Sequence, residues 1–213
     1  MLTRFFDRSP DNENPEAMGR RIPRHSGGWD AIRKHLSATS GLRILDVGMT
    51  SATNINLLTE MGHSVYMADL LEDAWSQEWR AEPDGEGNRA WRTEEFIAAN
   101  LNFSGRTFDV VLLWLTLDYL PEELLVPVVH ALHEVMAHGG QLLAFFNTKL
   151  NPEQAPYYRL HITSTDNIEL QLTQSFRQQR ALTNRNIERL FADWKGLKQF
   201  LAKDGVSESI IQR

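Results

Sequence analysis

The residues best placed for chemistry are two carboxylic acids and a glycine at the ends of two apolar segments. Asp46 and Gly48 close the first segment, in ILDVGMTSATN (44–54), and Asp69 closes the second, in SVYMADL (64–70). The first stretch has the form of a nucleotide-binding turn. Asp69 lies 23 residues after Asp46, close to the ~20 residues between the glycine turn and the ribose-binding acid of dinucleotide folds. The sequence therefore places two acceptor groups where a vicinal diol could be held.

The turn departs from the usual pattern at two positions, where Thr50 and Ala52 replace glycines. Glycine tolerates positive φ and lets a ligand approach the main chain closely, which Thr and Ala do less easily. Ser51 and Thr53 are good N-caps for the helix that follows, whose first amides would face an anionic group. The turn is small, polar and rich in donors, so we expect Thr50, Ser51 and Asn54 to take part in the site.

Alternating strands and helices must position these residues. Apolar runs predict strands at 42–47, 64–70, 95–100, 108–114 and 141–148, and helical spacing predicts helices at 53–62, 71–82 and 121–140. The run at 108–114 has no polar alternation, which indicates a strand buried on both faces. This order is typical of an α/β fold with a doubly wound, mostly parallel sheet.

The second half of the chain has antiparallel character. Strict period-two alternation at 158–163 and 168–173 predicts a β-hairpin with one solvated face, inserted after the fifth strand. Residues 183–194 predict a helix. The apolar segments around Asp204 and Gly205 predict a terminal strand pair, because Asp-Gly between apolar strands is a strong hairpin signal.

Composition limits the classes of protein. With 213 residues and 42% hydrophobic content, the chain suits one domain, which we place at 25–213 after a flexible leader at 1–24. It has neither a run of ~20 apolar residues nor a secretory signal, so we expect no membrane partner and a cytoplasmic location. The absence of cysteine excludes disulfides and thiolate chemistry. A net charge of −6 argues against a nucleic-acid partner.

A parallel sheet closed by a helix and an antiparallel hairpin resembles the class I S-adenosylmethionine-dependent methyltransferases, over about residues 41–213. Asp46-Val47-Gly48 matches the family's acidic-x-Gly turn. FDVVLLWLTLDYLPEE (108–123) and HGGQLLAFFN (138–147) resemble its fourth and fifth strands in small-molecule methyltransferases. The resemblance implies a seven-stranded sheet with an antiparallel C-terminal strand, and S-adenosylmethionine as cofactor.

The resemblance also assigns residues. Gly48, the helix start at 50–54 and Asp69 would hold the cofactor, with Asp69 on the ribose hydroxyls. The acid or amide near adenine would fall at about Asn100, and Trp114 and Tyr119 lie where adenine or a substrate would stack. Asp46 would bind the cofactor or cap the turn.

Methyl transfer is an in-line displacement in which the sulfonium supplies the leaving-group activation, so alignment and desolvation do most of the work. An acceptor hydroxyl or amine still needs a base, for which Asp118 and His161 are the candidates. His130 and His133 are three residues apart on a predicted helix but have no further ligand in register, so we predict no metal site.

The Asn/Asp-Pro-Pro-aromatic motif of enzymes that methylate nucleic-acid amines is absent, which favours a small-molecule acceptor, with a protein as the other option. The substrate would approach over the leader, the loop near Asp118 and Tyr119, and the hairpin at 157–161. The alternative hypothesis is a non-catalytic protein of the same fold that serves as a partner or regulatory module. The replaced glycines and the missing catalytic signature are its basis.

Overall fold

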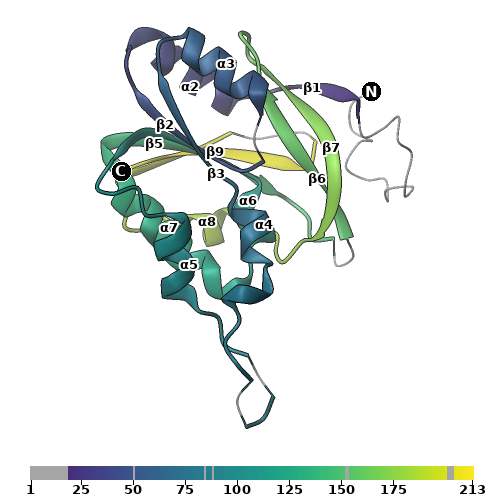
Figure 1. Ribbon diagram of the computed structural model, residues 1–213. Helices are drawn as coiled ribbons and strands as arrows, with labels where there is room; N and C mark the ends of the chain where they lie inside the picture. Colours follow the sequence, from purple (N-terminus) through teal and green to yellow (C-terminus); the bar gives the residue numbers. More distant parts are fainter. Residues whose placement is uncertain (1–18, 50, 84, 88, 152–153, 201–203) are drawn as a thin grey trace.

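Two β-sheets organise the chain. The structure, a computed structural model, describes residues 19–213 except 50, 84, 88, 152–153 and 201–203. In the described residues the central sheet has six strands in the order β3-β2-β4-β5-β9-β8 (Figure 1). These strands are β2 (Arg43–Val47), β3 (Ser64–Ala68), β4 (Phe108–Trp114), β5 (Met136–Asn147), β8 (Gly196–Phe200) and β9 (Val206–Gln212). β2 to β5 are parallel, and β9 runs antiparallel to both β5 and β8.

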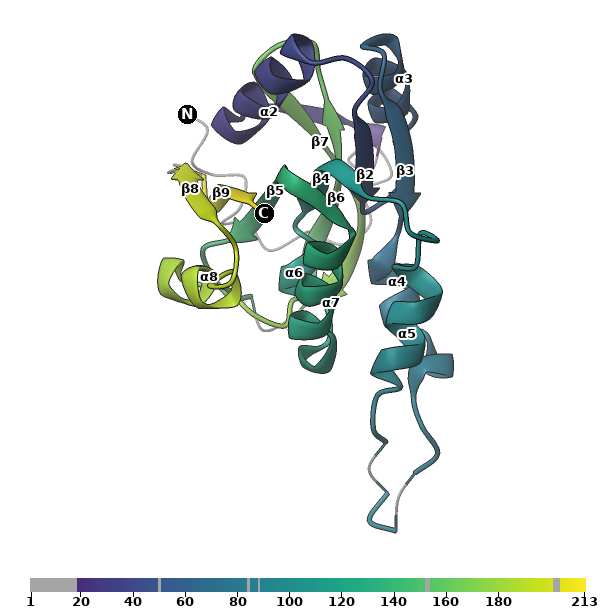
Figure 2. The same ribbon diagram turned by 90° about the vertical axis from the view of Figure 1, so that its left-hand side faces the viewer.

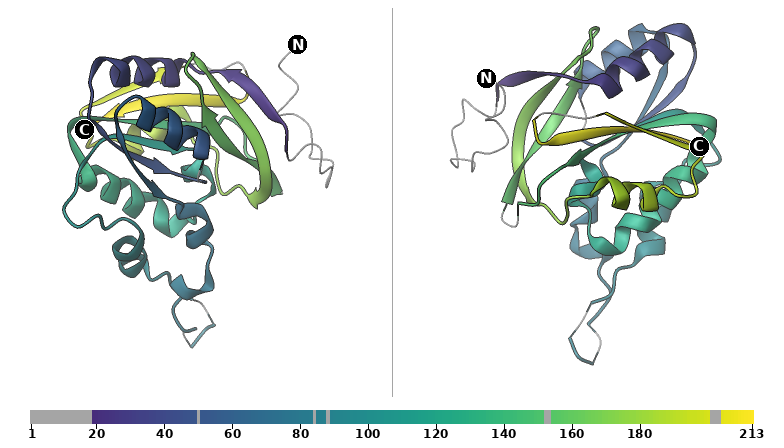
Figure 3. Two further views of the ribbon diagram at one scale, coloured as in Figure 1. Left: turned by 45° about the horizontal axis from the view of Figure 1, so that its top comes forward. Right: turned by 180° about the vertical axis from the view of Figure 1, so that it is seen from behind.

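The second sheet has the order β1-β7-β6 and is antiparallel throughout. It consists of β1 (Arg21–His25), β6 (Gln154–Ile162) and β7 (Asn167–Arg177). The antiparallel pairing of β6 with β7 confirms the strand pair that the alternation predicted. Figure 3 shows this sheet standing beside α3, against one end of the central sheet.

Helices cover both faces of the central sheet, as a doubly wound fold requires. α2 and α3 lie on one face and α5, α7 and α8 on the other (Figures 1 and 2). The bounds are α2 (Gly27–Ala38), α3 (Ala52–Glu60), α4 (Leu70–Ala74), η1 (Gln77–Trp79), α5 (Thr93–Asn100), α6 (Thr116–Tyr119), α7 (Glu122–Val135) and α8 (Asn184–Leu190). No helix of this described part is long and apolar enough to cross a membrane.

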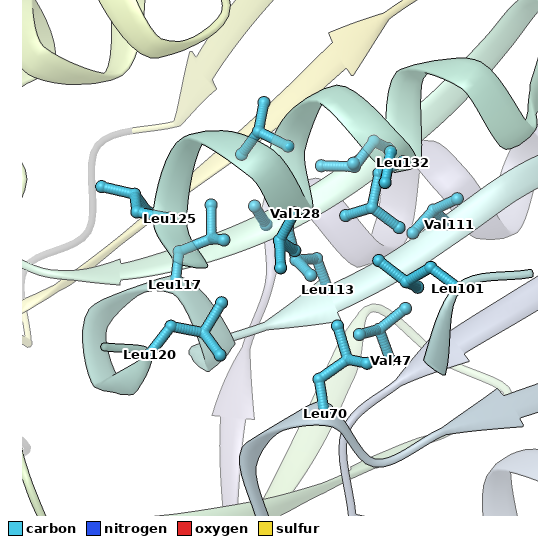
Figure 4. Close-up of a cluster of buried hydrophobic side chains, with 14 of the residues drawn as sticks. Val47, Leu70, Leu101, Val111, Leu113, Leu117, Leu120, Leu125, Val128 and Leu132 are labelled. Carbon is cyan, nitrogen blue, oxygen red and sulfur yellow. The ribbon is translucent and has the colours of Figure 1, made fainter. Parts of the chain in front are cut away.

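β4 links the two halves of the core because it is buried on both faces, as its apolar run predicted. Val111 and Leu113 face the cluster that α7 covers (Figure 4), and Val110 and Leu112 face the cluster that α2 and the second sheet cover. Each strand position thus contributes to one of two cores, in the period-two pattern of a central strand.

Several elements differ from the predictions. The count of seven strands is not confirmed, because the central sheet has six strands among the described residues. The segment 95–100, predicted as a strand, is helix α5, which Glu94 and Glu95 favour by facing the N-terminal end of its dipole. The helix predicted at 71–82 is the short α4 followed by η1.

The last residues assigned to the flexible leader at 1–24 form a strand. Residues 21–24 belong to β1, which pairs with β7 from Arg21 opposite Gln171 to His25 opposite Asn167. Residues 1–18 lie outside the described residues, so the expectation of flexibility there stays a prediction.

Candidate functional site

The order of the strands creates the site. β2 lies between β3 and β4, with Asp46 opposite Met67 and Leu112. The chain leaves β2 toward β3 on one side and later returns to β4 on the other, so a topological switch point lies at the carboxyl ends of β2 and β4. Ligands of open α/β sheets bind at this crevice. The sheet therefore brings Asp46, Asp69 and the residues after β4 to one edge.

Asp46 is fully buried and hydrogen-bonded on both oxygens. The indole N–H of Trp114 donates to its Oδ1 (2.5 Å), and the side-chain amide of Asn54 donates to its Oδ2 (3.2 Å). Burial raises the pKa of Asp46 to about 6, although these two hydrogen bonds lower it. Asp46 thus fixes the end of β4 and the start of α3, the structural role that the sequence left open for it.

Gly48 allows a side chain to lie directly on the main chain of the turn. A Cβ at this position would come within 2.8 Å of Trp114 Cδ1, which is closer than real Cβ contacts. Trp114 itself is buried and has φ of 51°, a left-handed conformation that is strained for a residue with a large side chain. The space that glycine provides is therefore filled by the indole of Trp114.

The start of α3 carries the predicted polar residues. Ser51 is its N-cap and accepts from the amide of Asn54 (3.2 Å). The Asn54 side chain donates to the carbonyl of Leu160 (3.1 Å) and accepts from the amide of Ile162 (2.8 Å). Asn54 thereby fastens β6 to the helix start. Thr50 lies outside the described residues, so its proposed contact stays a prediction.

Asp69 follows β3 and precedes α4. Burial raises its pKa, while the backbone amides of Glu72 and Leu71 lower it. Its Oδ1 is buried and has no hydrogen-bond partner within the described part of the chain. A buried, unpaired carboxylate oxygen is costly unless a ligand completes it, and a ribose diol would supply the missing donor.

Asp118 is the second buried acid with an unpaired oxygen. Its Oδ2 accepts from the backbone (2.5 Å) and side-chain (2.9 Å) amides of Asn147, and its Oδ1 has no partner among the described residues. Burial raises the pKa of Asp118 to about 8, although Asn147 and the Arg180 guanidinium lower it. A carboxyl group that titrates near neutral pH can exchange a proton with a bound acceptor.

His161, the other candidate base, is buried beneath the start of α3. Its Nδ1 lies 2.7 Å from Ser51 Oγ and its Nε2 lies 2.8 Å from Gln171 Oε1. Burial lowers the pKa of His161, which favours the neutral ring. With Nε2–H donated to Gln171, Nδ1 accepts from Ser51, so both nitrogens are engaged and His161 suits positioning better than proton transfer.

Tyr157 is the residue that the sequence placed near the substrate without giving it a role. It is 1% exposed, shares a hydrogen bond with the Thr116 side chain, and has its pKa raised first by burial and then by Asp69, Asp46 and Asp118. A β-bulge between Tyr157 and Tyr158 shifts the alternation of β6. Strict period two therefore could not show which of the two tyrosines faces inward.

Asn100 does not lie after a strand, as its predicted role required. It ends α5, and its side-chain amide donates to the Phe96 carbonyl of the same helix (3.0 Å). The predicted contact between Asn100 and adenine required Asn100 to follow a strand, and the structure does not place it there.

The arrangement fits a cationic ligand that carries a diol. Asp46, Asp69 and Asp118 all act on the hydroxyl of one buried residue, Tyr157, and two of the three acids have an unpaired oxygen. The guanidinium of Arg180 acts on Asp118 and lowers its pKa. Among the described residues, no group of three His, Cys, Asp or Glu side chains could hold a metal ion.

Solved structures with the same fold are distant in sequence. A S-adenosylmethionine-dependent methyltransferase from Methanosarcina mazei is 14% identical, with a TM-score of 0.50 over 84% of this chain and 96% of its own. The CcbJ methyltransferase from Streptomyces caelestis is also 14% identical, with a TM-score of 0.50 over 87% of this chain and 94% of its own. No protein-family model and no curated protein sequence matches the chain. The likeness is one of fold, and the chain has the class I methyltransferase fold that its sequence predicted.

Proposed function

We propose that this protein binds S-adenosylmethionine at the carboxyl ends of β2, β3 and β4 and transfers its methyl group to a small molecule. The observation that carries the proposal is the buried, unpaired Oδ1 of Asp69. It follows the strand next to the glycine turn, where the fold offers a ribose-binding acid. The two ribose hydroxyls would satisfy it with charge-assisted hydrogen bonds.

The charge of the site supports the same cofactor. The negative charge of Asp69 raises the pKa of Asp46, and the sulfonium of S-adenosylmethionine is a cation that would offset this repulsion. The first amides of α3, capped by Ser51, would face the carboxylate of the methionine part. When bound, the cofactor supplies an activated methyl group. The protein's share is to align the acceptor and to exclude water.

Asp118 is the residue we assign to proton transfer. Its pKa of about 8 lies near the working pH of a general base, and its free Oδ1 is the atom that would take the proton of an acceptor hydroxyl or amine. Asn147 holds the other oxygen with two amide donors and thereby fixes the orientation of the carboxylate.

A second candidate function is favoured by one observation. The indole of Trp114 fills the approach to Gly48. A protein that had lost cofactor binding would have this appearance and would act through a partner, as the alternative hypothesis states. The same binding experiment separates the two candidates.

The test is calorimetric titration with S-adenosylmethionine and S-adenosylhomocysteine of the wild type, Asp69→Ala and Asp73→Ala. Asp73 is an exposed acid on α4 and serves as the control. Asp69→Ala should weaken binding by about 2 to 4 kcal/mol, roughly 30- to 1,000-fold in Kd, because charged acceptors make the stronger hydrogen bonds. Equal affinity in wild type and Asp69→Ala would refute the site, and no heat at millimolar ligand would favour the second candidate.

A further inference from the structure

Tyr157 lies at the carboxyl ends of β2 and β4, where the cofactor is proposed to bind. Its hydroxyl hydrogen-bonds the side chain of Thr116, which in turn donates to the carbonyl of Val47, the last residue of β2. Its ring packs edge-on against Tyr119 and Phe176, with centroids 5.1 and 5.5 Å apart. An aromatic side chain of the protein thus occupies volume at the strand ends that a bound cofactor would need.

Side chains of α3 fasten β6 over this volume. Asn54 holds the main chain of β6 at Leu160 and Ile162, and Ser51 holds His161. The bulge at Tyr157 lies next to these contacts on the same strand. Ser51 and Asn54 are residues predicted to bind the cofactor. In the structure their side chains form hydrogen bonds with β6 instead.

Trp114 makes a second contact of the same kind. It covers Gly48, as its 2.8 Å approach to the position of a Cβ shows, and it donates to Asp46. Its positive φ is a strained state that persists only where its surroundings hold it. A ligand that displaced the indole from Gly48 would allow that strain to relax.

We infer that Tyr157 is an intramolecular competitor for the cofactor, which keeps the site closed with the help of Trp114 until the ring is displaced. The inference rests on the proposed function and adds its regulation. Only the fraction of molecules with an open site can bind, so the apparent Kd is the intrinsic Kd divided by that fraction. Removing the ring should therefore tighten binding, whereas loss of an ordinary binding residue weakens it.

The experiment is calorimetric titration of wild type, Tyr157→Ala and Tyr158→Ala with S-adenosylhomocysteine. Tyr158 is the matched control, because it is the same residue type on the same strand and burial alone raises its pKa, without the three acids. Tyr157→Ala should bind at least about tenfold more tightly than wild type. Tyr158→Ala should bind like wild type.

Tyr157→Leu is a second variant in case Tyr157→Ala does not fold, because leucine leaves a smaller cavity in this buried position. Its affinity for S-adenosylhomocysteine should lie between those of wild type and Tyr157→Ala. Thermal melting shows which variants are folded. Equal affinity in wild type and both Tyr157 variants, with binding still lost in Asp69→Ala, would show that Tyr157 does not compete with the cofactor. The proposed cofactor site would still be supported. No binding in any folded variant would overturn both.

Discussion

Asp118 is the residue whose ionisation should be most visible in the stability of the protein above neutral pH. Burial raises its folded-state pKa to about 8, from about 3.9 for an exposed Asp. The folded protein therefore holds this proton more tightly than the unfolded chain. The resulting stabilisation is complete below the unfolded pKa and is lost as pH rises through the folded pKa.

The window from pH 7.5 to 8.5 isolates this effect. The pKa values of His63, His133 and His161 are lowered from 6.5, so these rings are largely neutral there in both states. Asp46 loses its proton near pH 6. The free energy of unfolding should fall by up to about 1.4 kcal/mol per pH unit in wild type.

Asp118→Asn should remove most of that fall, because the amide side chain at position 118 does not ionise. Its oxygen can still accept the hydrogen bonds from Asn147. Urea unfolding at pH 7.5, 8 and 8.5 measures the slope, with Asp73→Asn as an exposed control. A slope in Asp118→Asn as steep as in wild type would show that Asp118 is not the buried acid responsible.

Residue types and spacing predicted the acids of the site for a physical reason. Asp46 and Asp69 lie at or just after the ends of parallel strands, and such ends meet at one edge of a sheet. The same local reasoning missed Asn147 and Arg180, which reach Asp118 from β5 and from the segment after β7. Nothing in the residues next to them in sequence indicates that contact.

Among the elements, β1, α2 and β9 are joined by a buried charge. Glu208 accepts from Arg24, from the Ser26 hydroxyl (2.7 Å) and from the Gly28 amide (2.7 Å). A Cβ on Gly28 would lie 2.8 Å from Glu208 Oε2 and 2.6 Å from Leu143 Cδ1. The start of α2 can therefore approach β9 closely only because a glycine is there.

This network predicts unequal effects for two arginines of β1. Arg24 pairs with the buried Glu208 and with Asp204, whereas Arg21 pairs with Glu169 near the surface at 3.2 Å. Arg24→Ala leaves a buried charge unpaired and should lower the free energy of unfolding by about 3 kcal/mol. Arg21→Ala should lower it by less than about 1 kcal/mol. Urea denaturation compares them, and similar losses would contradict the role given to Glu208.

Sequence patterns predicted the elements where hydrophobic periodicity was strong. The buried run of β4 and the antiparallel pairing of the two C-terminal strands, β8 and β9, are both confirmed. The segment 95–100 was wrong because a short run with few apolar residues does not separate strand from helix. The buried His161 was missed because its cover comes from α3, at a residue 110 positions earlier in the chain.

For the molecule as a whole, the alternation of strands and helices was enough to predict a doubly wound sheet with an antiparallel end. The position of the second sheet was not predictable in the same way. Its strands are amphipathic, and amphipathicity shows only that one face is covered, not which part of the molecule covers it. That β6 closes the proposed site depends on contacts between distant segments.

The most direct test of the account is a crystal structure of the protein grown with S-adenosylhomocysteine. We predict that the ribose hydroxyls lie within hydrogen-bond distance of the Asp69 carboxylate, that the Tyr157 hydroxyl has left Thr116, and that Trp114 has moved off Gly48. A structure at saturating ligand in which Tyr157 and Trp114 keep their present positions and no ligand contacts Asp69 would contradict it.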